Sequence, residues 1–158
     1  ILPILIARQM KQKNLIKKFF NYEGNLTEYD TDTITKKTIS YNMNEFDKKF
    51  NTLIGICEQS SQSEIRLWSD SLKKTSSKAF YDLSKDTVFL SKKNILLQFF
   101  RIFFRRKLYM FGSNSLLKSS EFIFGSERLI LNNTGHFAFF DDKTKFLSVF
   151  LKLIYNCK

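Results

Sequence analysis

The stretch Lys92–Phe111, KKNILLQFFRIFFRRKLYMF, is the most informative segment for the fold of this chain. Within it, Ile95–Phe104 is apolar except at Gln98 and Arg101, which predicts a short helix. Ten helical residues span about 15 Å, about half of the hydrocarbon core of a bilayer, so this helix cannot cross a membrane. Basic residues lie at both ends of the run and within it: Lys92, Lys93, Arg101, Arg105, Arg106 and Lys107.

Three interpretations of this segment are open at the level of sequence. It forms a buried helix with basic ends, a helix that lies on an anionic membrane surface, or a helix that faces RNA. On a membrane, Lys and Arg side chains extend from an apolar helix to the lipid headgroups. On RNA, the same side chains bind phosphates. The last two interpretations make the six basic residues candidate contacts for lipid or for a partner.

The beginning of the chain shows a related order of side chains. Ile1–Ala7, ILPILIA, is apolar, and five basic residues follow without an acid: Arg8, Lys11, Lys13, Lys17 and Lys18. Such an order is typical of the end of a membrane span with the basic residues on the retained side. The alternative is a helix that begins with Pro3 in its first turn, where proline is tolerated. We predict a basic helix that leaves the membrane over residues 1–20, with the preceding part of the membrane helix upstream of Ile1.

The charge of the chain favours anionic partners. The 158 residues carry a formal net charge of +11, and 18 of them are Phe. No acidic residue occurs in Ile1–Tyr22 or in Thr87–Ser120, so the surplus is concentrated in two regions. A compact chain with this surplus repels itself unless RNA, anionic lipid or acidic subunits compensate. The abundance of Ile, Phe, Lys, Asn and Ser also matches the codon bias of organelle genomes and of A/T-rich protist nuclei.

The middle of the chain is predicted to be helical after a polar linker. Asn21–Asn44 has no helical period and is rich in Thr and Asp, which indicates a linker over residues 21–44. Apolar residues then recur every three or four positions over Phe46–Cys57 and over Ser63–Leu83, which predicts two amphipathic helices. These helices begin a mainly helical domain over residues 45–158.

The C-terminal part is predicted to contain a small β element. Phe122–Phe124 and Arg128–Leu131 have the composition of strands, and Asn132–Gly135 has that of a turn. His136–Phe140 is then the return strand of a β-hairpin, and Thr144–Tyr155 forms a final helix. The predicted fold class is mainly α, with elongated helices, a small β-hairpin near the C-terminus and the end of an N-terminal membrane helix.

The sequence contains no catalytic or cofactor motif. It has no Walker-type loop, no Gly-rich dinucleotide loop and no HExxH. His136 is the single histidine and is expected to be structural or solvated, as are Asp141 and Asp142. Cys57 and Cys157 are expected to be free thiols in a reducing compartment. We therefore predict that the chain is not an enzyme and binds no cofactor or metal.

One family resemblance lies at the N-terminus. The opening ILPILIARQMKQKN resembles the segment that follows the single membrane span in mitochondrially encoded ATP synthase subunit 8 of plants, algae and protists. In that family, a Lys/Arg-rich helix leaves the membrane on the matrix side, and Pro3, Arg8, Lys11 and Lys13 lie at matching places. A second similarity is Leu67–Leu83, LWSDSLKKTSSKAFYDL, where extended members carry a Ser- and aromatic-rich helix. The family's Met-Pro-Gln-Leu beginning and its membrane span do not occur in this sequence.

The resemblance implies a structural role in the mitochondrial inner membrane. It implies a non-catalytic subunit in the membrane sector and peripheral stalk of F-type ATP synthase, which holds the stator against the rotor's torque during proton-driven ATP synthesis. The implied partners are other subunits of the complex and anionic lipid such as cardiolipin.

Two other functions fit the same composition. A mitochondrial ribosomal protein would bind rRNA through its N-terminal basic run and through Lys92–Lys107. An accessory subunit of a respiratory-chain complex would share the basic, apolar character of the chain.

Overall fold

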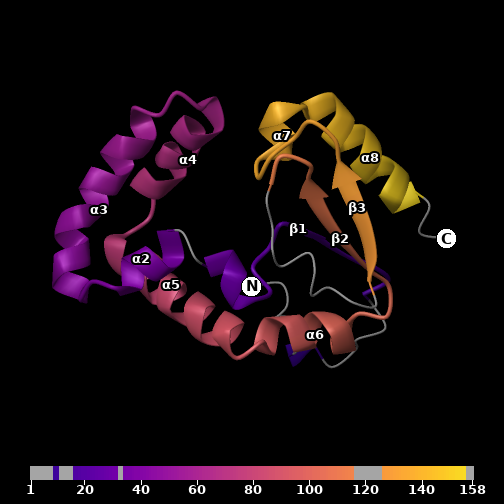
Figure 1. Cartoon of the computed structure of the whole chain (residues 1–158), viewed down its shortest axis with the longest axis horizontal. Coiled ribbons are helices and arrows are strands. Elements are labelled where there is room, and N and C mark those ends of the chain that lie inside the picture. The colour runs from indigo at the N-terminus through magenta and orange to yellow at the C-terminus, as the bar shows by residue number, and fades with distance from the viewer. Residues whose placement is uncertain (1–8, 11–15, 32–33, 116–125, 156–158) are drawn as a thin grey trace. The chain divides into compact units, whose positions relative to one another are not determined.

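The computed structural model describes residues 9–10, 16–31, 34–115 and 126–155. These residues are mostly helical, with a small β-sheet, which confirms the predicted fold class in outline (Figure 1). None of the helices within these ranges combines the length and the apolar character that crossing a bilayer requires. The chain divides into two compact units, which we call the helical unit (residues 31–90) and the sheet unit (residues 1–30 and 91–158). These boundaries differ from the predicted divisions at residues 20 and 44.

The helical unit has a core that forms between helices adjacent in sequence. Phe46, Phe50, Cys57 and Leu72 are buried, and Trp68 and Phe80 pack against them. The predicted helix over Phe46–Cys57 is confirmed. The helices are α2 (Ile34–Ile39), α3 (Met43–Glu58), α4 (Ser63–Lys73) and α5 (Ser77–Lys92), of which the last two residues of α5 belong to the sheet unit.

Hydrogen bonds at helix ends explain where the prediction of one helix over Ser63–Leu83 is wrong. Helix α4 ends at Lys73, and the amide of Thr75 donates to the carbonyl oxygen of Leu72 (2.9 Å). The hydroxyl of Ser76 then accepts from the amide of Ala79 (3.1 Å), so that it caps a new helix. The apolar spacing continues across this break, which is why periodicity alone missed it.

The predicted linker over residues 21–44 is also wrong in part. A 3₁₀ helix occupies Glu28–Thr31, α2 follows, and the side chain of Leu26 is fully buried. The segment ends in a capping box, in which the Asn42 side chain accepts from the amide of Glu45 (2.9 Å) and the Glu45 carboxylate accepts from the amide of Asn42 (3.0 Å). Short polar elements of this kind lack the apolar repeat on which the prediction relied.

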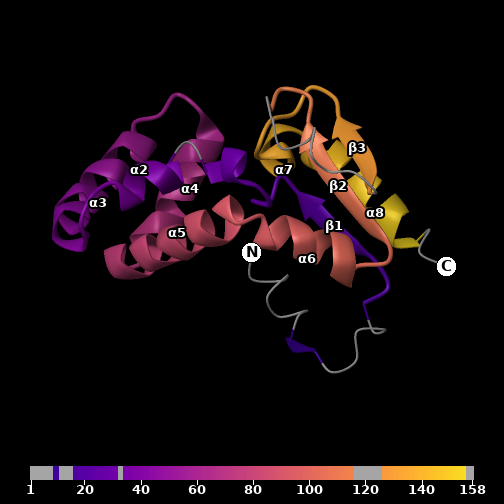
Figure 2. The same cartoon turned by 60° about the horizontal axis from the view of Figure 1, so that its bottom comes forward.

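The sheet unit contains three parallel strands in the order β1-β2-β3. Phe19 pairs with Lys107, and Leu108 pairs with Glu127. Figure 2 shows α6 below the strands and α8 behind them. The elements are β1 (Phe19–Tyr22), α6 (Ile95–Phe103), β2 (Lys107–Gly112), β3 (Glu127–Leu131), α7 (Ala138–Asp141) and α8 (Lys143–Tyr155).

Alternation along β1 places helices on both faces of the sheet. The ring of Phe19 stacks on that of Phe104, just after α6, with centroids 4.0 Å apart. The next side chain points to the other face, where Phe20 contacts Phe150 of α8 with centroids 5.9 Å apart. Parallel sheets are usually covered on both faces in this way. Tyr109, Met110 and Phe100 are among the most deeply buried side chains that result.

The β element differs from the predicted hairpin. β3 pairs with β2 in parallel, and instead of a return strand, His136 and Phe137 form a turn and Ala138–Phe140 belong to α7. The turn itself is confirmed over Asn132–Gly135, where Asn133 adopts a φ of 60°. The strand at Arg128–Leu131 and the final helix are confirmed as β3 and α8, whereas Phe122–Phe124 lies outside the described residues.

Two further predicted helices have different outcomes, one near the N-terminus and one within Lys92–Phe111. The predicted basic helix over residues 1–20 falls largely on residues 1–8 and 11–15, which lie outside the described part of the chain, and its last two residues belong to β1 instead. The helix predicted over Ile95–Phe104 is confirmed as α6, which ends at Phe103; the chain becomes extended at Phe104 and enters β2 at Lys107.

Candidate functional site

The basic residues of the N-terminal run differ in their exposure and contacts. Lys17 is exposed, and Arg8, Lys11 and Lys13 lie outside the described residues. The side chain of Lys18 is only 15% exposed, because its ammonium group pairs with Glu127 of β3 (3.5 Å) and lies over the ring of Phe20. Lys18 is therefore a contact within the sheet unit.

The basic residues around α6 are mostly exposed. Lys92 and Lys93 precede the helix, Arg101 lies in its last turn, and Arg105 and Arg106 follow it; all five are exposed. The structure thus brings together, around one nine-residue helix, most of the cations that the sequence placed in this region. The two lysines lie before the start of α6 and the three arginines at or after its end, so positive charge flanks the helix at both ends.

Lys107 has a separate, structural role. Its ammonium group donates to the carbonyl oxygens of Arg101 and of Phe104 (3.0 Å for the latter), at the C-terminal end of α6. These carbonyls have no partner within the helix, and a cation stabilises this end of the helix dipole. Burial and the neighbouring Arg101 charge lower the pKa of Lys107.

The outer face of α6 combines this charge with an exposed apolar side chain. Leu96, Leu97 and Phe100 point into the sheet unit and are buried. Ile102 points outward and is 76% exposed, the highest value among the large hydrophobic side chains that the structure describes as exposed. Ile102 lies in the last turn of α6 beside exposed Arg101, and exposed Arg105 and Arg106 follow the helix, so an apolar side chain and three cations share this end of α6.

A different feature lies at the carboxyl edge of the sheet, where β1 and β2 end. Glu23 follows β1, and its side chain is fully buried although its backbone has a φ of 43°. One carboxylate oxygen accepts from the amide of Gly112 at the end of β2 (2.8 Å). The other lies 2.7 Å from Nδ1 of His136, in the turn after β3. One buried carboxylate therefore joins the ends of all three strands.

Glu23 and His136 each stabilise the charged form of the other. Burial raises the pKa of Glu23, but the hydrogen bonds from His136, Ser115 and Gly112 outweigh it, so the pKa lies below its ordinary value. The hydrogen bond to Glu23 raises the pKa of His136 against the effect of burial. Because Nδ1 faces the carboxylate and the ring is 61% exposed, the contact fixes how His136 is oriented at the surface.

The groups around this pair are bonded to one another. The hydroxyl of Tyr22 donates to the carbonyl oxygen of Gly135, and burial raises its pKa to about 12. The amide of Gly135 donates to Asp141 (2.6 Å). A Cβ at Gly112 would lie 2.2 Å from the carbonyl oxygen of Thr134, so only glycine fits there. Among the described residues, no group of three or more His, Cys, Asp or Glu is placed to hold a metal ion.

Sequence reasoning missed Glu23. It expected His136 to be structural or solvated and placed it in a return strand, whereas the residue lies in a turn, is 61% exposed and contacts Glu23. The two residues lie far apart in the chain, and no local pattern marks a single Glu after a strand. The one available signal was that Glu23 is the first acid after the basic N-terminal run.

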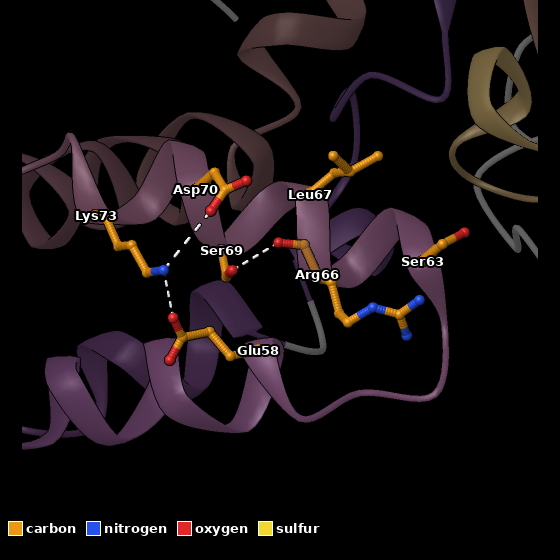
Figure 3. Close-up of a pocket in the computed structure, with 7 residues that line it drawn as sticks. All are labelled: Glu58, Ser63, Arg66, Leu67, Ser69, Asp70 and Lys73. Atoms are coloured by element: carbon orange, nitrogen blue, oxygen red, sulfur yellow. Dashed lines mark hydrogen bonds and ion pairs between the residues drawn. The ribbon is translucent and has the colours of Figure 1, made fainter.

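The helical unit has a shallow hollow of about 500 Å³ between α3 and α4. Figure 3 shows the ammonium group of Lys73 between the carboxylates of Glu58 and Asp70, the latter at 3.6 Å. The hydroxyl of Ser69 donates to the carbonyl oxygen of Arg66 (2.6 Å). These polar groups connect two helices at the surface, where ion pairs contribute little free energy.

Comparison with protein-family models, with curated proteins and with solved structures finds no significant match to this chain. The basic residues at the two ends of α6, together with exposed Ile102, are the surface feature that best supports a functional proposal.

Proposed function

We propose that this chain is a non-catalytic structural subunit of a membrane-bound mitochondrial assembly, and that α6 lies against its anionic lipid. The assembly we propose is the membrane sector and peripheral stalk of F-type ATP synthase, on the matrix side of the inner membrane. The resemblance of residues 1–14 and of Leu67–Leu83 selects this assembly. The properties of α6 support the contact with lipid.

The outer face of α6 carries the proposal. Ile102 is 76% exposed, and exposed Arg101, Arg105 and Arg106 surround the end of the helix. An apolar side chain enters the boundary between headgroups and acyl chains, while arginine side chains extend to phosphates. Each Lys or Arg near an anionic surface contributes about 1 kcal/mol. Five such residues suffice for binding that depends on anionic lipid.

The contacts of Glu23 at the carboxyl edge of the sheet support a structural role. The carboxylate of Glu23 bonds to Gly112, His136 and Ser115 of the same unit. Glu23 follows β1, whereas Gly112 ends β2, Ser115 follows β2 and His136 follows β3. An arrangement of this kind holds a framework together.

Vesicle flotation tests the lipid contact. The full chain is mixed with phosphatidylcholine vesicles that contain a fifth, by mole, of cardiolipin, or none. The double variant Arg105→Glu/Arg106→Glu is expected to bind at least about 30-fold more weakly, because two contributions of about 1 kcal/mol are lost and then reversed. The control Lys48→Glu/Lys85→Glu makes the same change in net charge at exposed positions of the helical unit. Equal losses in the two variants, or no loss in the first, would contradict the proposal.

Fractionation of native mitochondria tests the assembly. The chain is expected to remain with ATP synthase subunits in detergent and to resist RNase. Release by RNase would instead identify a ribosomal protein, and migration with a respiratory-chain complex would identify an accessory subunit.

A further inference from the structure

Helix α8 has two apolar stripes, one on each side. Phe146, Val149 and Leu153 pack against the buried residues of β2 and β3. Leu147, Leu151 and Ile154 form a second stripe at spacings of four and three, and they are 37%, 46% and 43% exposed. Tyr155, which is 74% exposed, extends it. A helix with so wide an apolar surface is normally buried on more than one side.

We infer that this second stripe (Leu147, Leu151, Ile154 and Tyr155) is a docking surface for a helix of a partner subunit that has its own apolar stripe and acidic flanks. This inference rests on the proposed function, because it assigns the surface through which the chain joins the assembly. Residues four and three apart on a helix lie on one face and fit the groove of a second helix.

The charges of α8 select an acidic partner. Lys143, Lys145 and Lys152 are the charged residues of the helix, and it contains no acid. Lys145 donates to the carbonyl oxygen of Asn132 (2.7 Å). Lys143, whose ammonium group lies over the ring of Phe139 (5.6 Å), and Lys152 are exposed beside the stripe. A second copy of the chain would bring like charges together, which disfavours self-association. Glu or Asp beside the partner's apolar stripe would complement these lysines.

The geometry of the sheet unit separates this surface from the lipid contact. Phe19 contacts Phe100 and Phe104 at α6, while Phe20 and Phe150 meet on the α8 side. Neighbouring side chains of a strand point to opposite faces, so α6 and α8 cover opposite faces of the sheet (Figure 2). A flat bilayer that touches the outer face of α6 cannot also touch that of α8. A subunit with lipid on one face and protein on the other would join the two.

Site-specific photo-crosslinking in the native assembly tests the inference. A photoreactive amino acid replaces Leu151, and separately Gln98 on the exposed side of α6, and crosslinked products are identified by mass spectrometry. We expect Leu151 to crosslink to a peptide of another subunit whose sequence has an apolar helical repeat and flanking acids. We expect Gln98 to crosslink to phospholipid. The exposed position Lys85 of the helical unit gives the background.

The outcomes at the two positions are distinguishable. Crosslinking of Leu151 to lipid, to RNA or to a second copy, or at the Lys85 background, would overturn the docking inference. Loss of lipid crosslinks at Gln98 would instead overturn the proposed contact of α6.

A pair of variants gives an independent measurement. Leu151→Asp is expected to lower the amount of chain retained in the assembly at least tenfold, while its thermal unfolding in isolation is unchanged. The control Ile130→Asp introduces the same charge at an apolar residue of β3 that is 51% exposed. This variant is expected to remain in the assembly in the same amount as the unsubstituted chain. Equal retention of the two variants would contradict the inference.

Discussion

The helical unit and the sheet unit obtain their cores in different ways. In the helical unit, Phe46 and Phe50 meet Phe80 across helices that follow one another within residues 31–90. In the sheet unit, β1 pairs with a strand that begins only at Lys107, after the whole helical unit. One core is built from near neighbours in sequence, and the other from distant segments.

The difference explains what each unit depends on. A helical core is supported by periodic apolar positions and by caps that lie within a few residues of each other. A parallel sheet depends on contacts whose formation requires long loops to close. In this chain, the buried carboxylate of Glu23 and the rings around Phe100 are the contacts that join distant segments. Substitutions there test whether the two units respond separately.

The largest effect is expected for Phe100→Ala. Phe100 is fully buried and meets Phe19 of β1, so its truncation should destabilise the sheet unit by about 3–5 kcal/mol. Chemical denaturation measures the loss, and hydrogen exchange locates it. Amides of β1 and β2 should lose protection more than those of α3 and α4.

The matched control is Ile102→Ala on the same helix. Ile102 is 76% exposed, so the isolated chain should change by less than about 0.5 kcal/mol. Equal loss of protection in both units after Phe100→Ala would mean that they unfold as one body.

A smaller effect is expected for Glu23→Ala. It leaves the amide of Gly112 without its buried acceptor and His136 without its partner, which should cost about 1–3 kcal/mol. Glu127→Ala removes a carboxylate of the same unit that is 71% exposed, and it should cost less than about 1 kcal/mol. Denaturant midpoints compare the two, and similar shifts would show that Glu23 is not a connection between strands.

The helical unit should respond to the loss of a cap. Asn42→Ala removes the side chain that accepts from the amide of Glu45, so α3 should lose about 1 kcal/mol. Gln62→Ala, at the N-cap of α4, removes no side-chain cap bond and should change little. Exchange of the first amides of α3 reports the difference. Equal effects of the two substitutions would argue against the capping box.

The smallest effect is expected from pH. The pKa of Glu23 lies below its ordinary 4.5, so its contribution is present above about pH 4.5 and is lost as the pH falls through the folded-state pKa. The pKa of His136 lies above its ordinary 6.5, so its contribution is complete below pH 6.5 and is lost as the pH rises through the folded-state pKa. The stability of the sheet unit should therefore be greatest between about pH 4.5 and 6.5.

Because His136 is the single histidine, its ring protons give one NMR titration curve. Glu23→Gln should move that pKa down towards its ordinary value and flatten the pH profile. The neighbouring titratable groups Tyr22, which stays neutral in this pH range, and Asp141 bond to Gly135 and stay in place in this variant. An unchanged titration would show that Glu23 does not control His136.

The sequence predicted the helices whose apolar repeat continues to their ends. α3 and α8 follow from Phe46–Cys57 and Thr144–Tyr155, because each needs only one apolar stripe to be recognised. The break at Ser76 escaped prediction because a serine cap contributes no apolar signal. The partner of Arg128–Leu131 was assigned to His136–Phe140, the nearest segment that could form a strand, whereas the true partner is β2.

The candidate site was predicted in part for the same reason. The cations around α6 are close together in sequence, so their clustering in space follows directly. Whether a cation is free at the surface depends on tertiary contacts, and for this reason Lys18 and Lys107 proved to be bonded within the sheet unit. Glu23 became visible only when three distant strand ends came together.

In the sequence, the whole helical unit lies between β1 and β2, and this order has a consequence for biosynthesis. A ribosome adds about 5–20 residues per second, so β1 leaves the exit tunnel on the order of ten seconds before the strand with which Phe19 pairs. By the time that strand emerges, every residue of the helical core has been synthesised. The nascent chain can therefore complete its helices first, while the apolar strand Phe19–Tyr22 is open to chaperones.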